Sequence, residues 1–358
     1  MEDRFILDNT VPGEQKPLRE EGLRKPSLLL VGVLYSIAVL LLIFVGSRVQ
    51  SAEFYSGILI TEFVLVLAPA LALLFLFRYD IKRVLRLNAI SLTNAALIVG
   101  SMIFAMPLVG VLNAVNLVVI KSIFGKLLIN QPPVAADFTG LLLNILVIGG
   151  AAGICEEVLF RGTIQRGFER FGAVKAILFT SLLFGLMHVD FQKLLGTFLL
   201  GAIIGFIVYR SNSLYGGMLA HFTNNSTAVI LAFLLDQLNK LVQKSGMVPE
   251  KTAPQGDLDF SAFANLPIEQ VIGAIVFWAI FILACAGVFT LLITTFIKRT
   301  SGKAVEIPQE RAGFDKRLIL GLLPGLAAVG FIYFVQGLRL RGISIQALEG
   351  MLNILGLK

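Results

Sequence analysis

The residues of this chain that are best suited to chemistry lie close together in the sequence. Glu156 and Glu157 form an adjacent carboxylate pair near the end of an apolar run, and Arg161 follows them. The chain has only two histidines, His188 and His221, and both lie inside later apolar runs. An ionisable side chain within an apolar membrane helix is energetically costly, so each of these residues is a candidate for function.

Helical spacing gives the two carboxylates different surroundings. Glu157 and Arg161 are four residues apart with the acid first, so they can form an ion pair on one helix face. Glu156 is turned by about 100° toward another face. We therefore expect Glu157 to be paired with Arg161, and Glu156 to be left for chemistry.

Spacing along the chain also predicts that Glu156 and His188 meet. A helical hairpin that turns near Gly172 would hold them equally far from the turn, at one level of two antiparallel helices. His221 lies at a comparable depth beyond a later connection, and Asn225 follows it by one helical turn on the same face. Four polar residues lead us to expect that the tip of the hairpin protrudes into the cytoplasm: Gln165, Arg166, Glu169 and Arg170.

The composition shows that a bilayer must surround the helices that carry these residues. Of the 358 residues, 56% are hydrophobic and 15% are charged, whereas soluble domains carry about 25% charged residues. The mean hydropathy of +0.85 agrees. These values exclude a soluble enzyme, a disordered protein and a secreted disulfide scaffold. The net charge is +7, and the basic residues lie in short blocks between apolar runs. This distribution is typical of residues that orient a protein in a membrane, and it does not indicate a nucleic-acid partner.

We expect an all-α fold, a polytopic membrane helical bundle of about eight to nine transmembrane helices. Nine apolar runs are candidates for spans, and the count falls to eight if one run is re-entrant or interfacial. Basic residues alternate between successive connections, so the positive-inside rule places the N-terminus in the cytoplasm of a multi-pass protein of the cell membrane. The apolar runs cover residues 27–46, 57–77, 95–120, 138–160, 174–189, 194–209, 214–235, 271–297 and 318–335.

Three motifs in this chain together resemble the family called CPBP or Abi, which includes CAAX prenyl protease 2 type and bacteriocin-processing enzymes. The family pattern is Glu-Glu-x-x-x-Arg, then Phe-x-x-x-His, then His-x-x-x-Asn or Asp. The resemblance covers roughly residues 138–235. In this chain the motifs read Glu156-Glu157-Val-Leu-Phe-Arg161, Phe184-Gly-Leu-Met-His188 and His221-Phe-Thr-Asn-Asn225.

The resemblance implies an intramembrane endopeptidase whose site opens to the cytoplasm. On this basis Glu156 and His188 activate a water molecule, while His221 and Asn225 stabilise the oxyanion. The expected partners are the lipid bilayer and a membrane-associated peptide or protein substrate, with or without a lipid anchor. The supporting residues are Glu157, Arg161 and Phe184.

The segments of the chain follow from the apolar runs and the resemblance together. We expect a cytoplasmic polar tail, N-terminal transmembrane helices, a CPBP-like catalytic core of transmembrane helices, a loop, and C-terminal transmembrane helices with an interfacial tail. In this order the segments cover residues 1–26, 27–137, 138–235, 236–270 and 271–358.

The resemblance leaves the chemical class of the protease open between a metallo type and a glutamate type. Glu156, His188 and His221 could form a zinc site with two histidines, one glutamate and a fourth position for water. We prefer the metal-free mechanism, since Asn225 is a natural oxyanion donor and a poor zinc ligand. The chain also has no His-Glu-x-x-His motif. Zinc is thus the cofactor that the metallo type would require.

Two other functions fit the same residues. A non-catalytic member of the same fold would act as a bacteriocin-immunity or scaffold protein. A proton-coupled transporter would use Glu156, His188 and His221 as a proton relay between helices. The transporter predicts repeated halves and paired discontinuous helices, and the sequence shows no such symmetry.

Overall fold

The computed structural model describes residues 22–128, 133–245, 266–304 and 315–343, together with residues 20, 346 and 350. Within this part of the chain the fold is an all-α bundle with 8 helices that are long and apolar enough to cross a membrane. The helix Ala173–Met187 is apolar but shorter. The prediction of a polytopic bundle with about eight to nine membrane helices is therefore confirmed. The long helices are Leu28–Ala52, Phe54–Leu76, Leu92–Phe124, Phe138–Phe171, Leu194–Ser211, Leu214–Lys244, Ile268–Arg299 and Lys316–Leu340.

Three of the spans are built from several helical segments. In the first two spans, α-helices are joined by π-helical segments, Leu42–Gly46 and Ile60–Leu67. The first span contains α1 (Leu28–Leu41) and α2 (Ser47–Ala52), and the second contains α3 (Phe54–Leu59) and α4 (Ala68–Leu76). The fourth contains α7 (Phe138–Asn144), α8 (Ala152–Glu157) and α9 (Gln165–Phe168), with π-helical segments at Ile145–Ala151 and Val158–Ile164.

The other helices are continuous. A short helix, α5 (Ile81–Val84), precedes the third span, α6 (Leu92–Phe124). The remaining helices are α10 (Ala173–Met187), α11 (Leu194–Ser211), α12 (Leu214–Lys244), α14 (Ile268–Arg299) and α15 (Lys316–Leu340).

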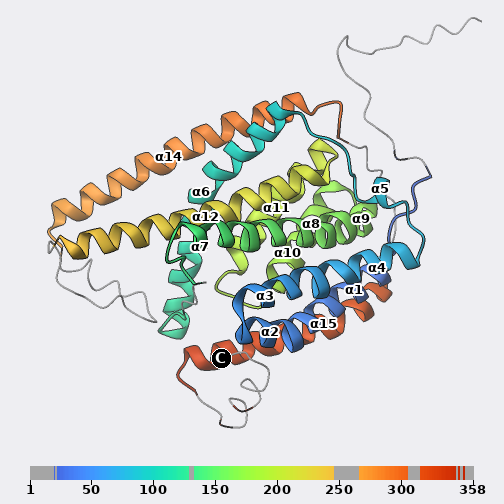
Figure 1. Ribbon diagram of the computed structural model, residues 1–358, viewed down its shortest axis with the longest axis horizontal. Coiled ribbons are helices and arrows are strands. Elements are labelled where there is room, and N and C mark those ends of the chain that lie inside the picture. The colour runs from blue at the N-terminus through green and yellow to red at the C-terminus, as the bar shows by residue number, and fades with distance from the viewer. Residues whose placement is uncertain are drawn as a thin grey trace, which may run out of the picture.

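The fourth span and α10 to α12 lie in the middle of the bundle (Figure 1). On one side α12 packs against α6, and α14 packs along α6 at the edge. On the other side α1 and α15 pack against each other, and α1 also contacts α4 and α9. The helices that carry the three motifs are thus enclosed between two pairs of outer spans.

The segment expected to be a loop, residues 236–270, is helical at both ends. The helix α12 continues to Lys244, and α14 begins at Ile268. The extension of α12 contains an ion pair of 2.6 Å between Asp236 and Lys240 at i,i+4 spacing, which supports a polar helix. Most of the expected N-terminal tail, residues 246–265 and most of the expected interfacial tail lie outside the described residues.

Candidate active site

The fourth span approaches α12 closely at two glycines, Gly153 in α8 and Gly149 in the π-helical segment before it. A Cβ atom at Gly153 would lie 3.2 Å from the backbone nitrogen of Phe222, and one at Gly149 would lie 2.6 Å from Oγ of Ser226. Glycine therefore allows the backbones of the two helices to approach closely. The π-helical segments on both sides of α8 are a feature that is frequent at functional sites.

Glu157, at the end of α8, is the centre of a buried cluster. Nη1 of Arg161 donates a hydrogen bond of 2.8 Å to Oε1 of Glu157, as the spacing in the sequence predicts. Nδ1 of His221 lies 2.8 Å from the same oxygen. Oε2 of Glu157 has no hydrogen-bond partner among the described residues. We call Glu157, Arg161 and His221 the Glu157 cluster.

Gly217 leaves the room that the carboxylate of Glu157 needs. A Cβ atom at this position of α12 would lie 2.9 Å from Oε2 of Glu157 and 2.4 Å from Cγ2 of Val208. Any larger residue would push against the carboxylate. The position of Glu157 therefore depends on a glycine one helical turn before His221.

Arg161 connects the Glu157 cluster to α11 and α10. Nη2 of Arg161 donates a hydrogen bond of 2.9 Å to the carbonyl oxygen of Gly201 on α11. Its guanidinium carbon lies 4.6 Å from the ring centroid of Phe184 on α10, a distance at which a cation is attracted to an aromatic face. Arg161 thus fixes three helices around one buried carboxylate.

Phe184 contacts both histidines. Its ring centroid is 4.9 Å from that of His188 and 5.8 Å from that of His221. Nδ1 of His188 lies 2.9 Å from the carbonyl oxygen of Phe184; with the proton on Nδ1 it donates to this oxygen, and Nε2 is then an acceptor. His188 is exposed, whereas His221 is buried.

Glu156 is half-buried, and its Oε2 atom is enclosed without a hydrogen-bond partner. Within the described residues no hydrogen bond or ion pair joins it to His188, although the sequence predicts that these residues meet. Instead, Glu157 contacts a histidine, His221. Residue counting gives the level along a helix but not the rotation about its axis, and the π-helical segments around α8 alter that rotation.

Asn225 connects α12 to the fourth span. Its Nδ2 atom donates a hydrogen bond of 3.1 Å to the carbonyl oxygen of Ile148, and its Oδ1 atom accepts one of 3.0 Å from Nδ2 of Asn224. An amide nitrogen carries two hydrogens. One donor of Asn225 is therefore still available for a ligand.

The sequence reasoning missed a third carboxylate, Glu62. It lies in the π-helical segment of the second span, which packs against α8. The residue is 8% exposed, and its Oε2 atom has no hydrogen-bond partner among the described residues. Glu62 is close enough to Glu156 for the two charges to interact. The sequence does contain a signal for Glu62, because an ionisable residue inside an apolar run is a candidate for function. We had applied this criterion only to the motif region.

A second buried cluster lies further along the fourth span, where we expected a polar tip in the cytoplasm. Gln165, Arg166 and Glu169 are buried inside the protein, and the cytoplasmic position of this tip stays a prediction. The loop before α6 and the end of the N-terminal tail cover them and supply charges. Arg86 and Lys25 each lie 2.8 Å from a carboxylate oxygen of Glu169. The members of this Glu169 cluster are Glu20, Lys25, Arg86, Arg166 and Glu169.

Glu20 shows how strongly the Glu169 cluster favours ionised carboxylates. Burial alone would raise its pKa, but Arg166 and Arg86 outweigh this effect and lower the pKa to about 2. Nη2 of Arg166 lies 2.7 Å from Oε1 of Glu20, and Nζ of Lys25 lies 3.0 Å from Oε2. The carboxylate therefore stays charged throughout the neutral range.

The candidate zinc ligands do not come together. Among the described residues no group of three His, Cys, Asp or Glu side chains is placed to hold a metal ion. His221 contacts Glu157 rather than Glu156, and His188 contacts a carbonyl of its own helix. The three residues considered for zinc, Glu156, His188 and His221, thus do not fit a shared ion in this arrangement.

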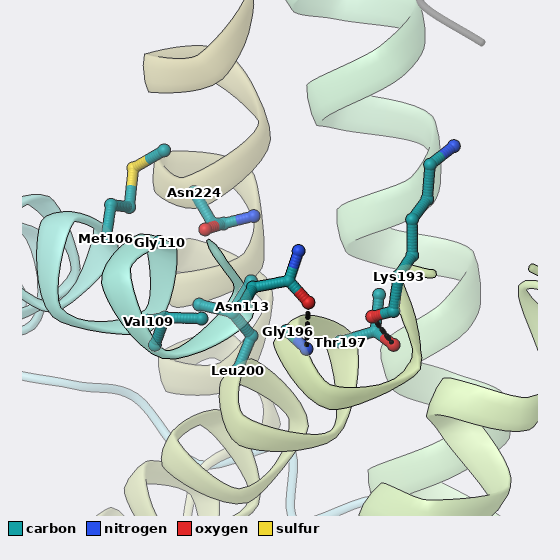
Figure 2. A pocket seen from close by; sticks show the side chains of 9 residues that line it. All are labelled: Met106, Val109, Gly110, Asn113, Lys193, Gly196, Thr197, Leu200 and Asn224. Atoms are coloured by element: carbon teal, nitrogen blue, oxygen red, sulfur yellow. Dashed lines mark hydrogen bonds between the residues drawn. The ribbon is translucent and has the colours of Figure 1, made fainter. Parts of the chain in front are cut away.

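A cavity of about 250 Å³ lies between α6, α11 and α12 (Figure 2). Figure 2 shows Asn113 of α6 bonded to the backbone of Gly196, with Asn224 of α12 at the same cavity. Because Asn224 is also bonded to Asn225, the cavity adjoins one side of the candidate site. Its lining consists of Met106, Val109, Gly110, Asn113, Lys193, Gly196, Thr197, Leu200 and Asn224.

Fold and site together define a polytopic helical membrane protein with several acidic side chains and His221 gathered inside the bundle. The family model described as type II CAAX prenyl endopeptidase Rce1-like matches residues 138–227. This match spans all three motifs, and the family resemblance recognised from them is confirmed. No curated protein and no solved structure matches the chain.

Proposed function

We propose that the protein is an intramembrane endopeptidase of the CAAX prenyl protease 2 type. Its substrates would be membrane-associated proteins or peptides, with or without a lipid anchor. The observation that supports this function best is the arrangement within the family-matched segment. There Glu157 orients His221 inside the bundle, and the neighbouring Glu156 keeps a carboxylate oxygen without a partner.

In this proposal Glu156 is the general base. An enclosed carboxylate oxygen without a hydrogen-bond partner can accept a proton from water as the water oxygen attacks the peptide carbonyl carbon. His188 supports this step with Nε2, the acceptor that remains when Nδ1 donates to the carbonyl of Phe184. As the tetrahedral intermediate collapses, the C–N bond breaks and the leaving amine takes up the proton.

His221 and Asn225 would stabilise the oxyanion that forms during the attack. Glu157 accepts from Nδ1 of His221, and a carboxylate in this position stabilises the protonated imidazole, whose Nε2–H can then donate to the oxyanion. Asn225 has one amide hydrogen left for the same purpose. Donors held in place before the reaction are among the strongest contributions to catalysis.

Glu157, Arg161 and Phe184 act as supporting residues in this proposal. Arg161 bonds to Glu157 and to α11, and it stacks on Phe184. The three side chains hold His221 and α8 in register. We further propose that the N-terminus lies in the cytoplasm, and that the protein resides in the cell membrane with its site open to the cytoplasm.

Comparison of peptide termini tests the function without a guessed substrate. Membranes from cells that express the wild type or Glu156→Gln are matched for folded protein, and all new N- and C-termini are identified by mass spectrometry. We expect termini that occur only with the wild type and share a cleavage sequence. Identical profiles from two folded, inserted proteins would contradict the protease.

One observation favours a second candidate, a non-catalytic member of the fold that acts in bacteriocin immunity or as a scaffold. Glu156 and His188 form no hydrogen bond or ion pair with each other in the described residues, so no direct contact links the two residues that would act on one water. If expression protects cells from an added bacteriocin, and Glu156→Gln protects equally well, the non-catalytic function would be favoured.

A further inference from the structure

The chain turns sharply directly after His188. Val189 has a φ of +52°, a left-handed conformation that is a genuine outlier for a β-branched residue. Such a conformation persists only where the surrounding structure holds it, and it often occurs at functional sites. Val189 directly follows His188, the C-cap residue of α10, so its conformation sets the direction in which the chain leaves this helix.

A side chain from the last membrane span holds this turn. Nε2 of Gln336 on α15 donates a hydrogen bond of 2.7 Å to the carbonyl oxygen of Val189. Oε1 of Gln336 accepts a hydrogen bond of 3.4 Å from the backbone N–H of Phe191. One amide group thus binds the backbone on both sides of Asp190. Gln336 lies far outside the family-matched residues 138–227.

The neighbouring contacts make the connection to α15 rigid. The ring of Phe191 lies 5.7 Å from that of Tyr333 on α15 and 5.6 Å from that of Phe124 at the end of α6. Gln192 then exchanges two hydrogen bonds with the backbone of Leu128, of 2.8 Å and 3.1 Å. The loop is therefore fixed from α15 at its start and from the end of α6 further on.

We propose that Gln336 is a positioning residue for His188. A primary amide in an apolar span is costly unless it is hydrogen-bonded, and here both of its polar atoms bind the backbone of the loop that follows His188. The C-terminal span α15 thus has a specific task, which is to hold the left-handed turn that orients the imidazole. This inference rests on the proposed function only where activity is measured.

Diethylpyrocarbonate, which acylates imidazole nitrogens, provides a readout that does not require activity. The chain has only two histidines, so peptide mass spectrometry of the labelled full-length protein in membranes reports on His188 and His221 separately. Nε2 of His188 is the nitrogen open to acylation, because Nδ1 is bonded to the carbonyl of Phe184 and the residue is exposed. We expect Gln336→Met to slow labelling of His188 several-fold, because the released turn no longer holds Nε2 in this exposed, accepting position. Labelling of His221 should not change. The matched control, Gln243→Met, alters an exposed glutamine at the end of α12 and should leave both rates unchanged.

A rescue variant separates positioning from general support by α15. Glycine adopts positive φ without strain, so Val189→Gly in the Gln336→Met background should restore the wild-type labelling rate of His188. The proposal is overturned if Gln336→Met leaves the His188 rate unchanged, if the rates of both histidines change equally, or if Val189→Gly fails to restore the rate. Should Gln336→Met not fold, Gln336→Glu is used in its place, since its carboxylate also cannot donate to Val189.

The number of new peptide termini then shows whether the positioning of His188 affects proteolytic activity. We expect fewer wild-type-specific termini per folded molecule with Gln336→Met, and recovery in the double variant. If the labelling behaves as expected but the wild type produces no specific termini, Gln336 positions His188 and the proposed protease function fails. If wild-type termini appear and labelling does not respond to Gln336→Met, the function stands and the positioning role is overturned.

Discussion

The Glu157 cluster and the Glu169 cluster are centred on two carboxylates of the same membrane span, yet their charges are balanced differently. Each carboxylate oxygen of Glu169 and Glu20 lies within ion-pair distance of an arginine or lysine. Glu157 has one arginine, one histidine and an oxygen without a hydrogen-bond partner.

This difference separates a scaffold from a site. Arginine and lysine stay protonated near neutral pH, so the Glu169 cluster has no group that exchanges a proton there. The Glu157 cluster contains a histidine, the side chain that changes charge most easily near neutral pH. Glu156 is the neighbour of Glu157 in the sequence, and Glu62 lies on the segment that packs against α8; each has an enclosed oxygen that lacks a hydrogen-bond partner among the described residues. Acids without a basic partner near a histidine favour chemistry, whereas carboxylates paired with arginine and lysine favour structural support.

The largest effect on stability is expected from breaking the Glu169 cluster. Glu169→Gln leaves Arg86 and Arg166 buried with too little negative charge, and removal of one partner from a buried ion pair costs about 3–5 kcal/mol. Urea unfolding of the purified protein in detergent micelles measures this loss. The control Asp236→Asn removes a partly exposed pair with Lys240 and should cost less than about 0.5 kcal/mol. Equal stabilities of the two variants would contradict a scaffold role.

A smaller loss is expected when the space beside Glu157 is filled. Gly217→Ala would place a Cβ atom 2.9 Å from Oε2 of Glu157, and overpacking of this kind costs about 1–3 kcal/mol. At Gly150, an added Cβ atom would meet no atom within 4 Å, so Gly150→Ala should be neutral or stabilising by up to about 1 kcal/mol. Unfolding midpoints of both variants check this contrast. If Gly217→Ala is as stable as the wild type, the close approach is not needed.

Substitution of Glu62 is expected to raise the stability of the protein instead of lowering it. Its buried oxygen lacks a partner, and leaving such a group unsatisfied costs about 1–3 kcal/mol. Glu62→Leu should therefore raise the unfolding free energy by about 1 kcal/mol, while the number of wild-type-specific peptide termini per folded molecule falls. Stability gained together with activity lost is typical of a residue kept for function. A loss of stability would show that Glu62 serves the fold.

The smallest expected effect is the change with pH in the stability that Glu20, a member of the Glu169 cluster, contributes. Arg166 and Arg86 lower the pKa of Glu20 to about 2 from the usual 4.5. A carboxylate with a lowered pKa in the folded state contributes stability above its unfolded pKa, and this contribution is lost as pH falls. The stability advantage of the wild type over Glu20→Gln should therefore shrink between pH 4.5 and pH 2. Unfolding midpoints across this range measure it, and a constant difference would contradict the ion pairing.

The sequence predicted those features that depend on one helix or on composition. Apolar runs predicted the membrane bundle, and the spacing of Glu157 and Arg161 predicted their ion pair. Features that depend on contacts between distant segments could not be predicted in this way. The contact of His221 with Glu157 depends on helix rotation. Burial of Arg166 requires the tail and the loop at Arg86, and Gln336 reaches the turn at Val189 from another span.

The contrast between the two clusters is tested most directly by Glu156→Gln and Glu169→Gln side by side. For each variant, the amount of folded protein in the membrane and the number of wild-type-specific peptide termini per folded molecule are measured. We predict that Glu156→Gln folds normally and produces none of these termini. Glu169→Gln should yield less folded protein with a normal number of termini per folded molecule. Normal termini from Glu156→Gln would contradict a catalytic site beside the Glu157 cluster.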